Sequence, residues 1–250
     1  MGNPVIDQLM NRRSVRAFSG ETVSDDDLAT ILRAAQQAPT SVNGQQVSLI
    51  VTRDKSTIRR IADIAGGQVQ VATADVFVTI VVDFNRTAHA CQAAGVTQQI
   101  ADSAEGLMVG AVDAGIMLMA LQVAAESLGY GTTAIGGIRR APQALVELLG
   151  LPAGTFPLVG TTIGVPDKTR LPRVKPRVPL SSFAMHERYD DAAVAAGVTE
   201  YDRTLAAWWQ EQGITDMPSY CRATAGYYQS DYFPTVGDVL ARQGFSLADK

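Results

Sequence analysis

The chain has 250 residues, enough for one large domain or two ordinary ones and for a substantial apolar core. Its formal net charge is −4, and this acidic balance argues against nucleic-acid binding, which needs a concentrated basic face. The two cysteines lie far apart and no C-x-x-C motif is present, so we expect no metal site. No apolar signal-peptide run opens the chain, and we expect a cytoplasmic protein.

The first half of the chain mixes helix and strand patterns. Ser24 is a good helix N-cap, three aspartates follow it, and the apolar spacing predicts a helix that ends near Ala38, before Pro39. Further along, a strand is predicted for 47–52, a short helix for 56–65 and a strand for 76–82. The second strand is continuously apolar, which indicates burial on both faces.

The longest apolar segment covers residues 104–128. Asp113, Gln122 and Glu126 lie within it and would be costly in lipid, so we predict a buried central helix, and no membrane partner. The remaining predicted elements are strands at 132–135 and 156–165 and helices at 142–149, 192–211 and 236–243.

Strands and helices alternate without the regular β-α-β pattern of a parallel sheet, which predicts an α+β fold. After residue 165 the composition changes, since four prolines space out an extended arm with little apolar periodicity. We therefore expect one domain over residues 1–250, of which about 166–250 form a C-terminal extension.

Common catalytic and nucleotide-binding motifs are absent. The chain has no G-x-G-x-x-G fingerprint after a predicted strand, no Walker A loop and no G-x-S-x-G elbow. His89 and His186 have no obvious serine or cysteine partner, so we assign no catalytic side chain. The chain offers fixed positive charge and non-titrating hydrogen-bond donors, a pattern that suits a cofactor carrying the chemistry itself.

Two basic clusters stand out against the acidic balance. One is Arg-Arg-Ser-Val-Arg at residues 12–16 and the other is Lys-Pro-Arg at residues 175–177. The planar fork of arginine donates two hydrogen bonds to adjacent phosphate oxygens, so such clusters suggest a bound phosphate. Taken alone, each cluster is also compatible with a solvated basic turn.

A series of short motifs in fixed order resembles the nitroreductase and flavin reductase superfamily, most closely its FMN-dependent, oxygen-insensitive NADPH nitroreductases and flavin reductases. The motifs are R-R-S-V-R-A-F (12–18), A-P-T-S-V-N-G-Q (38–45), G-G-Q (66–68), V-D-F-N-R (82–86), A-A-E-S-L-G-Y-G (124–131), I-G-G-I-R (135–139) and K-P-R-V-P (175–179). The resemblance covers about residues 5–210. It implies a nitroreductase-like fold, with a central mixed or antiparallel sheet flanked by helices. It also implies a homodimer whose C-terminal extension wraps the partner subunit.

The resemblance also implies an FMN site at the dimer interface. The cationic and hydroxyl ligands, at the phosphate and at the N1/O2 edge of the ring, would be Arg12, Arg13, Ser14, Arg16, Lys175 and Arg177. Hydroxyl, amide and backbone contacts, part of them from the second subunit, would come from Thr40, Ser41, Asn43, Gln45, Gln68, Ala134, Ile135, Gly136 and Gly137. The glycine pair would let the backbone approach the flat ring near N5.

The function implied by the resemblance is a two-step oxidoreductase reaction. NAD(P)H would reduce FMN by hydride transfer to N5 and leave, and a nitroaromatic, quinone, free flavin or oxyanion would then take the electrons. Two alternatives remain open: a flavin-binding storage or sensor module without turnover, and a specialised flavin dehydrogenase or dehalogenase on the same scaffold.

The electron donor, NADPH or NADH, is left open by the sequence. The similar NADPH enzymes carry an arginine-rich loop after a late helix, whereas residues 212–218 here contain no arginine and include Asp216. Arg139, Arg140 or Arg222 could compensate, and Arg139 is our candidate for contact with the nicotinamide nucleotide.

Overall fold

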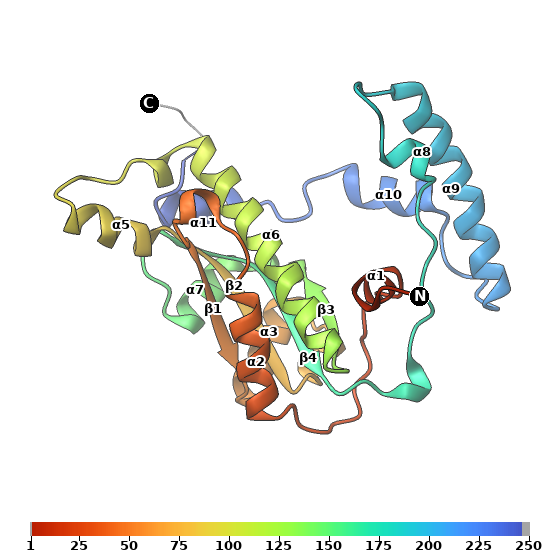
Figure 1. The fold of residues 1–250 in the computed structure, drawn as a ribbon, viewed down its shortest axis with the longest axis horizontal. Helices are drawn as coiled ribbons and strands as arrows, with labels where there is room; N and C mark the ends of the chain where they lie inside the picture. The colour runs from red at the N-terminus through yellow and green to blue at the C-terminus, as the bar shows by residue number, and fades with distance from the viewer. Residues whose placement is uncertain (1, 247–250) are drawn as a thin grey trace. The chain divides into compact units, whose positions relative to one another are not determined.

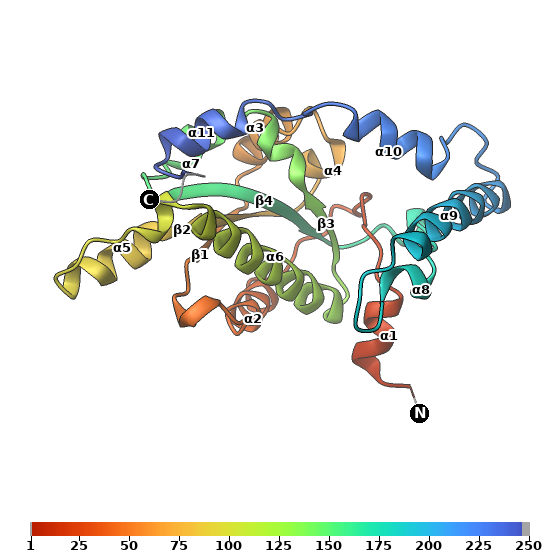
Figure 2. The ribbon, with the colours of Figure 1, turned by 90° about the horizontal axis from the view of Figure 1, so that it is seen from above.

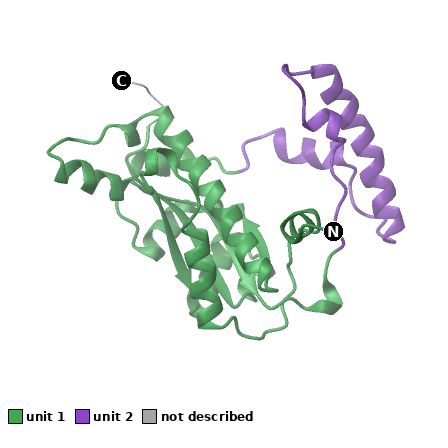
Figure 3. Ribbon diagram, viewed as in Figure 1, with its two compact units in different colours: residues 1–172, 233–250 green, residues 173–232 purple. Residues whose placement is uncertain are grey.

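The computed structural model describes residues 2–246 and divides the chain into two compact units (Figure 3). The second unit covers Arg173–Tyr232, so it begins close to the boundary expected for the C-terminal extension. Residues 233–246 return to the first unit, which the sequence did not predict. The reason is aromatic burial, because the ring of Phe245 packs edge-on against Phe84 and Phe156, with centroids 6.0 and 6.5 Å away.

The first unit is built on a four-stranded antiparallel sheet with the strand order β1-β2-β4-β3 (Figure 1). The strands are β1 (Val47–Thr52), β2 (Val76–Asp83), β3 (Gly131–Ile135) and β4 (Thr155–Gly164). Each lies within one residue of its predicted range at both ends, because β-branched residues bounded by polar or glycine-rich turns mark all of them. The predicted α+β class is confirmed, and the sheet is purely antiparallel.

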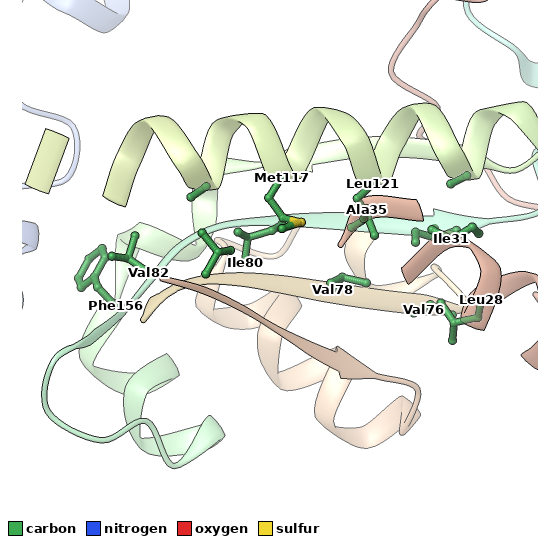
Figure 4. Close-up of a cluster of buried hydrophobic side chains, with 14 of the residues drawn as sticks. Leu28, Ile31, Ala35, Val76, Val78, Ile80, Val82, Met117, Leu121 and Phe156 are labelled. Carbon is green, nitrogen blue, oxygen red and sulfur yellow. The ribbon is translucent and has the colours of Figure 1, made fainter. Parts of the chain in front are cut away.

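Helices cover both faces of the sheet (Figure 2). On one face lie α2 (Asp25–Ala35) and α6 (Ala104–Ser127), and on the other α3 (Lys55–Ile64) and α7 (Pro142–Leu149). Alternate residues of β2 supply the two cores: Val76, Val78, Ile80 and Val82 face α2 and α6 (Figure 4), whereas Phe77 packs with α3 and α7. The predicted burial of this strand on both faces is therefore confirmed.

Three helices of seven residues or more were not predicted: α1 (Pro4–Met10), α5 (Phe84–Ala93) and α10 (Tyr220–Tyr228). Each has a side-chain N-cap, from Asn3, Asp83 and Ser219 respectively. The remaining elements are α4 (Val69–Ala72), α8 (Leu180–Phe183), α9 (Asp191–Glu211) and α11 (Val236–Arg242), with 3-10 turns at Ser41–Asn43, Ile100–Asp102, Gly136–Arg140 and Lys168–Arg170.

Helix α6 packs against the sheet as a central helix, with one face buried and the opposite face exposed in the single chain. Asp113 and Gln122 are buried on the packed face, together with small and apolar residues. The opposite side exposes an apolar stripe of Met108, Val112, Ile116 and Met119. By length and composition alone α6 could cross a membrane. Its packing against the sheet is that of a core helix.

Candidate functional site

The basic segment, residues 12–16, lies along the edge strand β3. The backbone N–H of Val15 donates to the carbonyl of Thr132 over 2.8 Å, and the Thr133 hydroxyl donates to the carbonyl of Val15. A Cβ atom at Gly131 would come within 2.6 Å of the Val15 side chain, so only glycine allows this close approach. Val15 is buried and Arg16 is exposed, as expected for an extended segment whose side chains alternate.

Arg12 is tied to helix α6. Its Nη2 donates to the Gln122 side-chain oxygen over 2.7 Å, and Gln122 in turn donates to the Thr161 hydroxyl over 3.0 Å. The Arg12 Nε lies 3.9 Å from the Glu126 carboxylate. Arg12 was predicted only as a phosphate ligand, and the structure adds a role as the anchor of the basic segment.

Glu126 places a carboxyl group beside the basic segment. Burial raises its pKa, while the hydrogen bond from Thr132 and the positive charges of Arg12 and Arg13 act in the opposite direction. A cavity of about 430 Å³ opens here, lined in part by Arg12, Arg13, Glu126 and Lys168. An acidic group thus lies at the edge of this cavity, next to two of the arginines of the basic segment.

Gln68 and the glycine pair, far apart in sequence, lie against each other. Strand β3 ends at Ile135 and continues into the turn Gly136–Arg140. A Cβ at Gly137 would come within 2.3 Å of the Gln68 side-chain nitrogen and 2.9 Å of the Ala65 carbonyl oxygen. Gln68 is held there by donating to the Ala65 carbonyl over 3.1 Å. The structure thus brings together an amide side chain and a glycine backbone, and their contact with a flavin ring stays a prediction.

The basic segment and the glycine pair stand at two ends of one strand. Val15 is bonded to Thr132 of β3, and Gly136 follows the last residue of the same strand. The stretch from Thr132 to Gly136 is roughly 13 Å long in strand geometry. Ala134, between them, is exposed. Positive charge at one end and a glycine backbone at the other fit FMN, whose phosphate and ring are separated by a ribityl chain.

The polar loop 40–46 has an unusual backbone. Val42, Asn43 and Gln45 adopt positive φ values of 47°, 54° and 52°. Such values are uncommon for residues other than glycine and are outliers for a β-branched valine. Strain of this kind persists only where the surroundings enforce it, and it clusters at functional sites.

The loop is anchored on Asp113 of α6, a residue that the sequence analysis did not assign to the site. The Asp113 carboxylate accepts a hydrogen bond from the Ser41 backbone N–H over 3.0 Å and another from the Gln46 side-chain amide. The stretch of α6 from Asp113 to Gln122 is roughly 14 Å long. One helix thus anchors both the polar loop and the basic segment, at separate points.

Lys175 and Arg177 belong to the second unit. The Lys175 Nζ lies 4.7 Å from the centre of the Trp209 ring, and Trp209 is buried, as expected for a packing residue. Arg177 donates to the backbone carbonyls of Lys175 and Pro176 over 2.8 and 3.1 Å. The role predicted for these two cations at FMN stays a prediction.

Arg139, the candidate contact for the nicotinamide nucleotide, is held within the first unit. Its guanidinium donates to the carbonyl of Leu158 and lies 5.6 Å from the centre of the Phe233 ring. It also folds back over the glycine pair, because a Cβ at Gly136 would come within 3.2 Å of its Nη2. Contact with a nucleotide stays a prediction for this residue.

Comparison with known proteins gives a consistent result over nearly the whole chain. The model of the nitroreductase family matches residues 9–165, and that of the C-terminal domain of the same family matches residues 175–248. The chain is 37% identical to the FMN reductase [NAD(P)H] of Bacillus subtilis over 98% of its own length and 99% of that protein.

Solved structures agree with these sequence matches. The structure of NfrA2 from B. megaterium superimposes with a TM-score of 0.95 at 36% identity, covering 99% of this chain and 100% of that one. The NADPH:FMN oxidoreductase of Vibrio harveyi, solved in complex with NAD+, gives a TM-score of 0.87 at 30% identity, covering 99% of this chain and 100% of that one.

Proposed function

The chain belongs to the nitroreductase family, and from this premise we propose that it is an FMN-dependent NAD(P)H oxidoreductase of the nitroreductase and flavin reductase type. The observation that carries the proposal is the arrangement along β3. The basic segment is fixed at one end of this strand, and the Gly136–Gly137 backbone faces Gln68 at the other.

Each part of the site has a defined task in this proposal. Arg13 and Ser14 bind the phosphate, and Arg16 supplies positive charge at the N1/O2 edge of the ring. The backbone of Gly136 approaches the ring near N5, and Gln68 donates to its polar edge. When bound, FMN supplies the redox chemistry: it accepts a hydride from NADPH or NADH and passes electrons to a small-molecule acceptor. Lys175 and Arg177 are included as proposed ligands on the strength of the motif resemblance.

We further propose that the protein is a cytoplasmic homodimer. The stripe of Met108, Val112, Ile116 and Met119 on α6 is an apolar surface that a second copy would cover. The polar loop is anchored on the same helix, so a second copy bound at this stripe would bring its own loop close to the flavin site. In that arrangement Thr40, Ser41, Asn43 and Gln45 act on the flavin of the partner subunit.

The proposal is tested by the absorption spectrum of the purified protein, followed by anaerobic addition of NADH and of NADPH. We expect bound FMN and bleaching of the flavin by at least one donor. A protein that takes up no FMN would contradict the proposed function. A protein that binds FMN but is bleached by neither donor would be a flavin-binding module without turnover.

Arg13→Ala tests the phosphate assignment within the same experiment. Loss of a charged hydrogen bond predicts an FMN dissociation constant raised about tenfold or more. The matched control is Arg33→Ala, on the exposed side of α2, where the guanidinium donates to the Thr30 hydroxyl of its own helix over 3.3 Å. Equal FMN affinity in the two variants would show that Arg13 does not hold the phosphate.

A further inference from the structure

A buried carboxylate holds the polar loop in place. Asp113 is only 4% exposed, and among residues 2–246 no lysine or arginine forms an ion pair with it. Burying a charge without a cation is costly unless hydrogen bonds compensate. The compensation comes from the polar loop, since the Ser41 backbone N–H and the Gln46 amide both donate to the same carboxylate oxygen of Asp113.

These two donors lie at opposite ends of the strained part of the loop. Ser41 precedes and Gln46 follows the three residues with positive φ, Val42, Asn43 and Gln45. Inside the loop, Gly44 N–H donates to the Ser41 carbonyl over 2.9 Å, and Gln45 N–H donates to the Thr40 hydroxyl over 3.1 Å. These local bonds curl the loop. The Gln46 carbonyl also accepts from the Asp83 N–H over 2.9 Å, which ties the end of the loop to the sheet, whereas Asp113 ties both ends of the loop to one point on α6.

The strain needs such an external anchor. A β-branched residue in the left-handed region is unfavourable, and Val42 gains no burial in return, since its side chain is 97% exposed. A charged acceptor makes stronger hydrogen bonds than a neutral one, so the Asp113 carboxylate is suited to hold this conformation against relaxation.

We infer that Asp113 is a positioning residue for the flavin site, which holds the strained loop so that Ser41, Asn43 and Gln45 are presented to FMN before it binds. The inference rests on the proposed function. Asp113 itself lies beneath the loop and acts through it, so it is not a catalytic residue. Without the carboxylate the loop populates other conformations. The apparent FMN affinity then equals the intrinsic affinity multiplied by the fraction of time in which the loop is correctly placed.

The experiment compares Asp113→Ala, Asp113→Asn and Met117→Ala with the unmodified protein. Met117 is the matched control, because it lies on the same buried face of α6, and its truncation destabilises the core while Asp113 keeps both hydrogen bonds from the loop. The first measurement is the dissociation constant of FMN added to protein stripped of flavin. The second is hydrogen exchange of the peptide containing the Ser41 amide in the flavin-free protein.

We expect Asp113→Ala to raise the FMN dissociation constant about tenfold or more and to speed exchange at Ser41, with Asp113→Asn intermediate because its oxygen is still an acceptor. Met117→Ala should change neither measurement, although it lowers thermal stability. An alanine variant with unchanged affinity, or a Met117→Ala variant that loses as much affinity, would overturn the inference. If Asp113→Ala does not fold, Asp113→Asn is used as the test. An FMN dissociation constant and a rate of exchange at Ser41 that are both unchanged in Asp113→Asn would overturn the inference. Failure of the unmodified protein to bind FMN would instead contradict the proposed function.

Discussion

Gly137 lies so close to Gln68 that a Cβ atom at residue 137 would come within 2.3 Å of the Gln68 side-chain nitrogen. The same atom would come within 2.9 Å of the Ala65 carbonyl oxygen, which is backbone and cannot swing away. The identity of residue 137 is therefore fixed by close approach and not by a positive φ angle. The contact couples the turn after β3 to the segment before α4.

Gly137→Ala is the first test of this contact. We expect the added methyl group to displace Gln68 and the turn, and to raise the FMN dissociation constant about tenfold, the scale of one charged or two neutral hydrogen bonds. The control is Gly237→Ala, in α11, where a Cβ would meet nothing within 4 Å. Gly237→Ala should be neutral or stabilising by up to about 1 kcal/mol in urea unfolding, with FMN affinity unchanged. An unchanged FMN affinity in Gly137→Ala would show that the turn does not carry the ring site.

Arg12 and Arg13 are adjacent in sequence but differ in their partners, which predicts different effects on stability. Arg12→Ala removes the donor to Gln122, which is only 2% exposed, and should lower the free energy of unfolding of the flavin-free protein by about 1–3 kcal/mol. Arg13→Ala should change it by less than about 0.5 kcal/mol, as is usual away from buried networks.

Urea unfolding of the two flavin-free variants measures this difference. Equal stability of the arginine variants would mean that the bond between Arg12 and Gln122 contributes nothing to the fold. FMN affinity is a separate readout, and both substitutions should lower it, Arg12→Ala through the position of the segment and Arg13→Ala through the phosphate.

The sequence was sufficient to predict the sheet and most helices, because these depend on local patterns. Strand β2 is continuously β-branched and aromatic, and α2 begins with a serine cap and three aspartates. Helix α5 was missed because it starts directly at the end of β2, where Asp83 both closes the strand and caps the helix. Where a strand passes into a helix without a turn, no separate run of glycine, proline or polar turn residues marks the boundary between them.

The side chains proposed to bind FMN could be selected from residue type, whereas the residues that hold them in place could not. Arg13, Ser14 and Gln68 are polar donors within recognisable motifs. Asp113 and Gln122 lie in an otherwise apolar helix, and their partners Ser41 and Arg12 are separated from them by 72 and 110 residues. Only the tertiary structure brings such pairs together, so the sequence pointed to the two polar residues as unusual in α6 without showing what they bind.

Val42→Gly tests whether the polar loop is strained. Glycine adopts positive φ without steric cost, so the relief of strain should offset the entropy that glycine loses on folding, and the free energy of unfolding should stay level or rise by up to about 1 kcal/mol. The control is Val51→Gly in β1, a valine that is 36% exposed and lies in a regular strand, which should lose at least about 0.5–1 kcal/mol. Equal losses in the two variants would contradict the strain.

Glu126→Gln tests the partly buried carboxyl group beside the basic segment through the pH dependence of stability. Burial raises the pKa of Glu126 in the folded protein, so the folded state binds a proton more tightly than the unfolded state. The free energy of unfolding of the unmodified protein therefore falls as pH rises from the ordinary glutamate pKa to the raised one, and glutamine removes this contribution. A glutamine side chain keeps an oxygen that accepts the bond from Thr132.

The measurement is urea unfolding of the two flavin-free proteins at a series of pH values. The free energy of unfolding of Glu126→Gln should rise relative to that of the unmodified protein as pH increases from the ordinary to the raised pKa. Above the raised pKa the difference should stay constant. At low pH, where Glu126 is protonated in both states, the two proteins should unfold at similar denaturant concentrations. If instead the difference runs in the opposite direction, the attraction of Arg12 and Arg13 outweighs the burial of the carboxylate. The proposed phosphate site would then contain a charged carboxylate that repels the FMN phosphate.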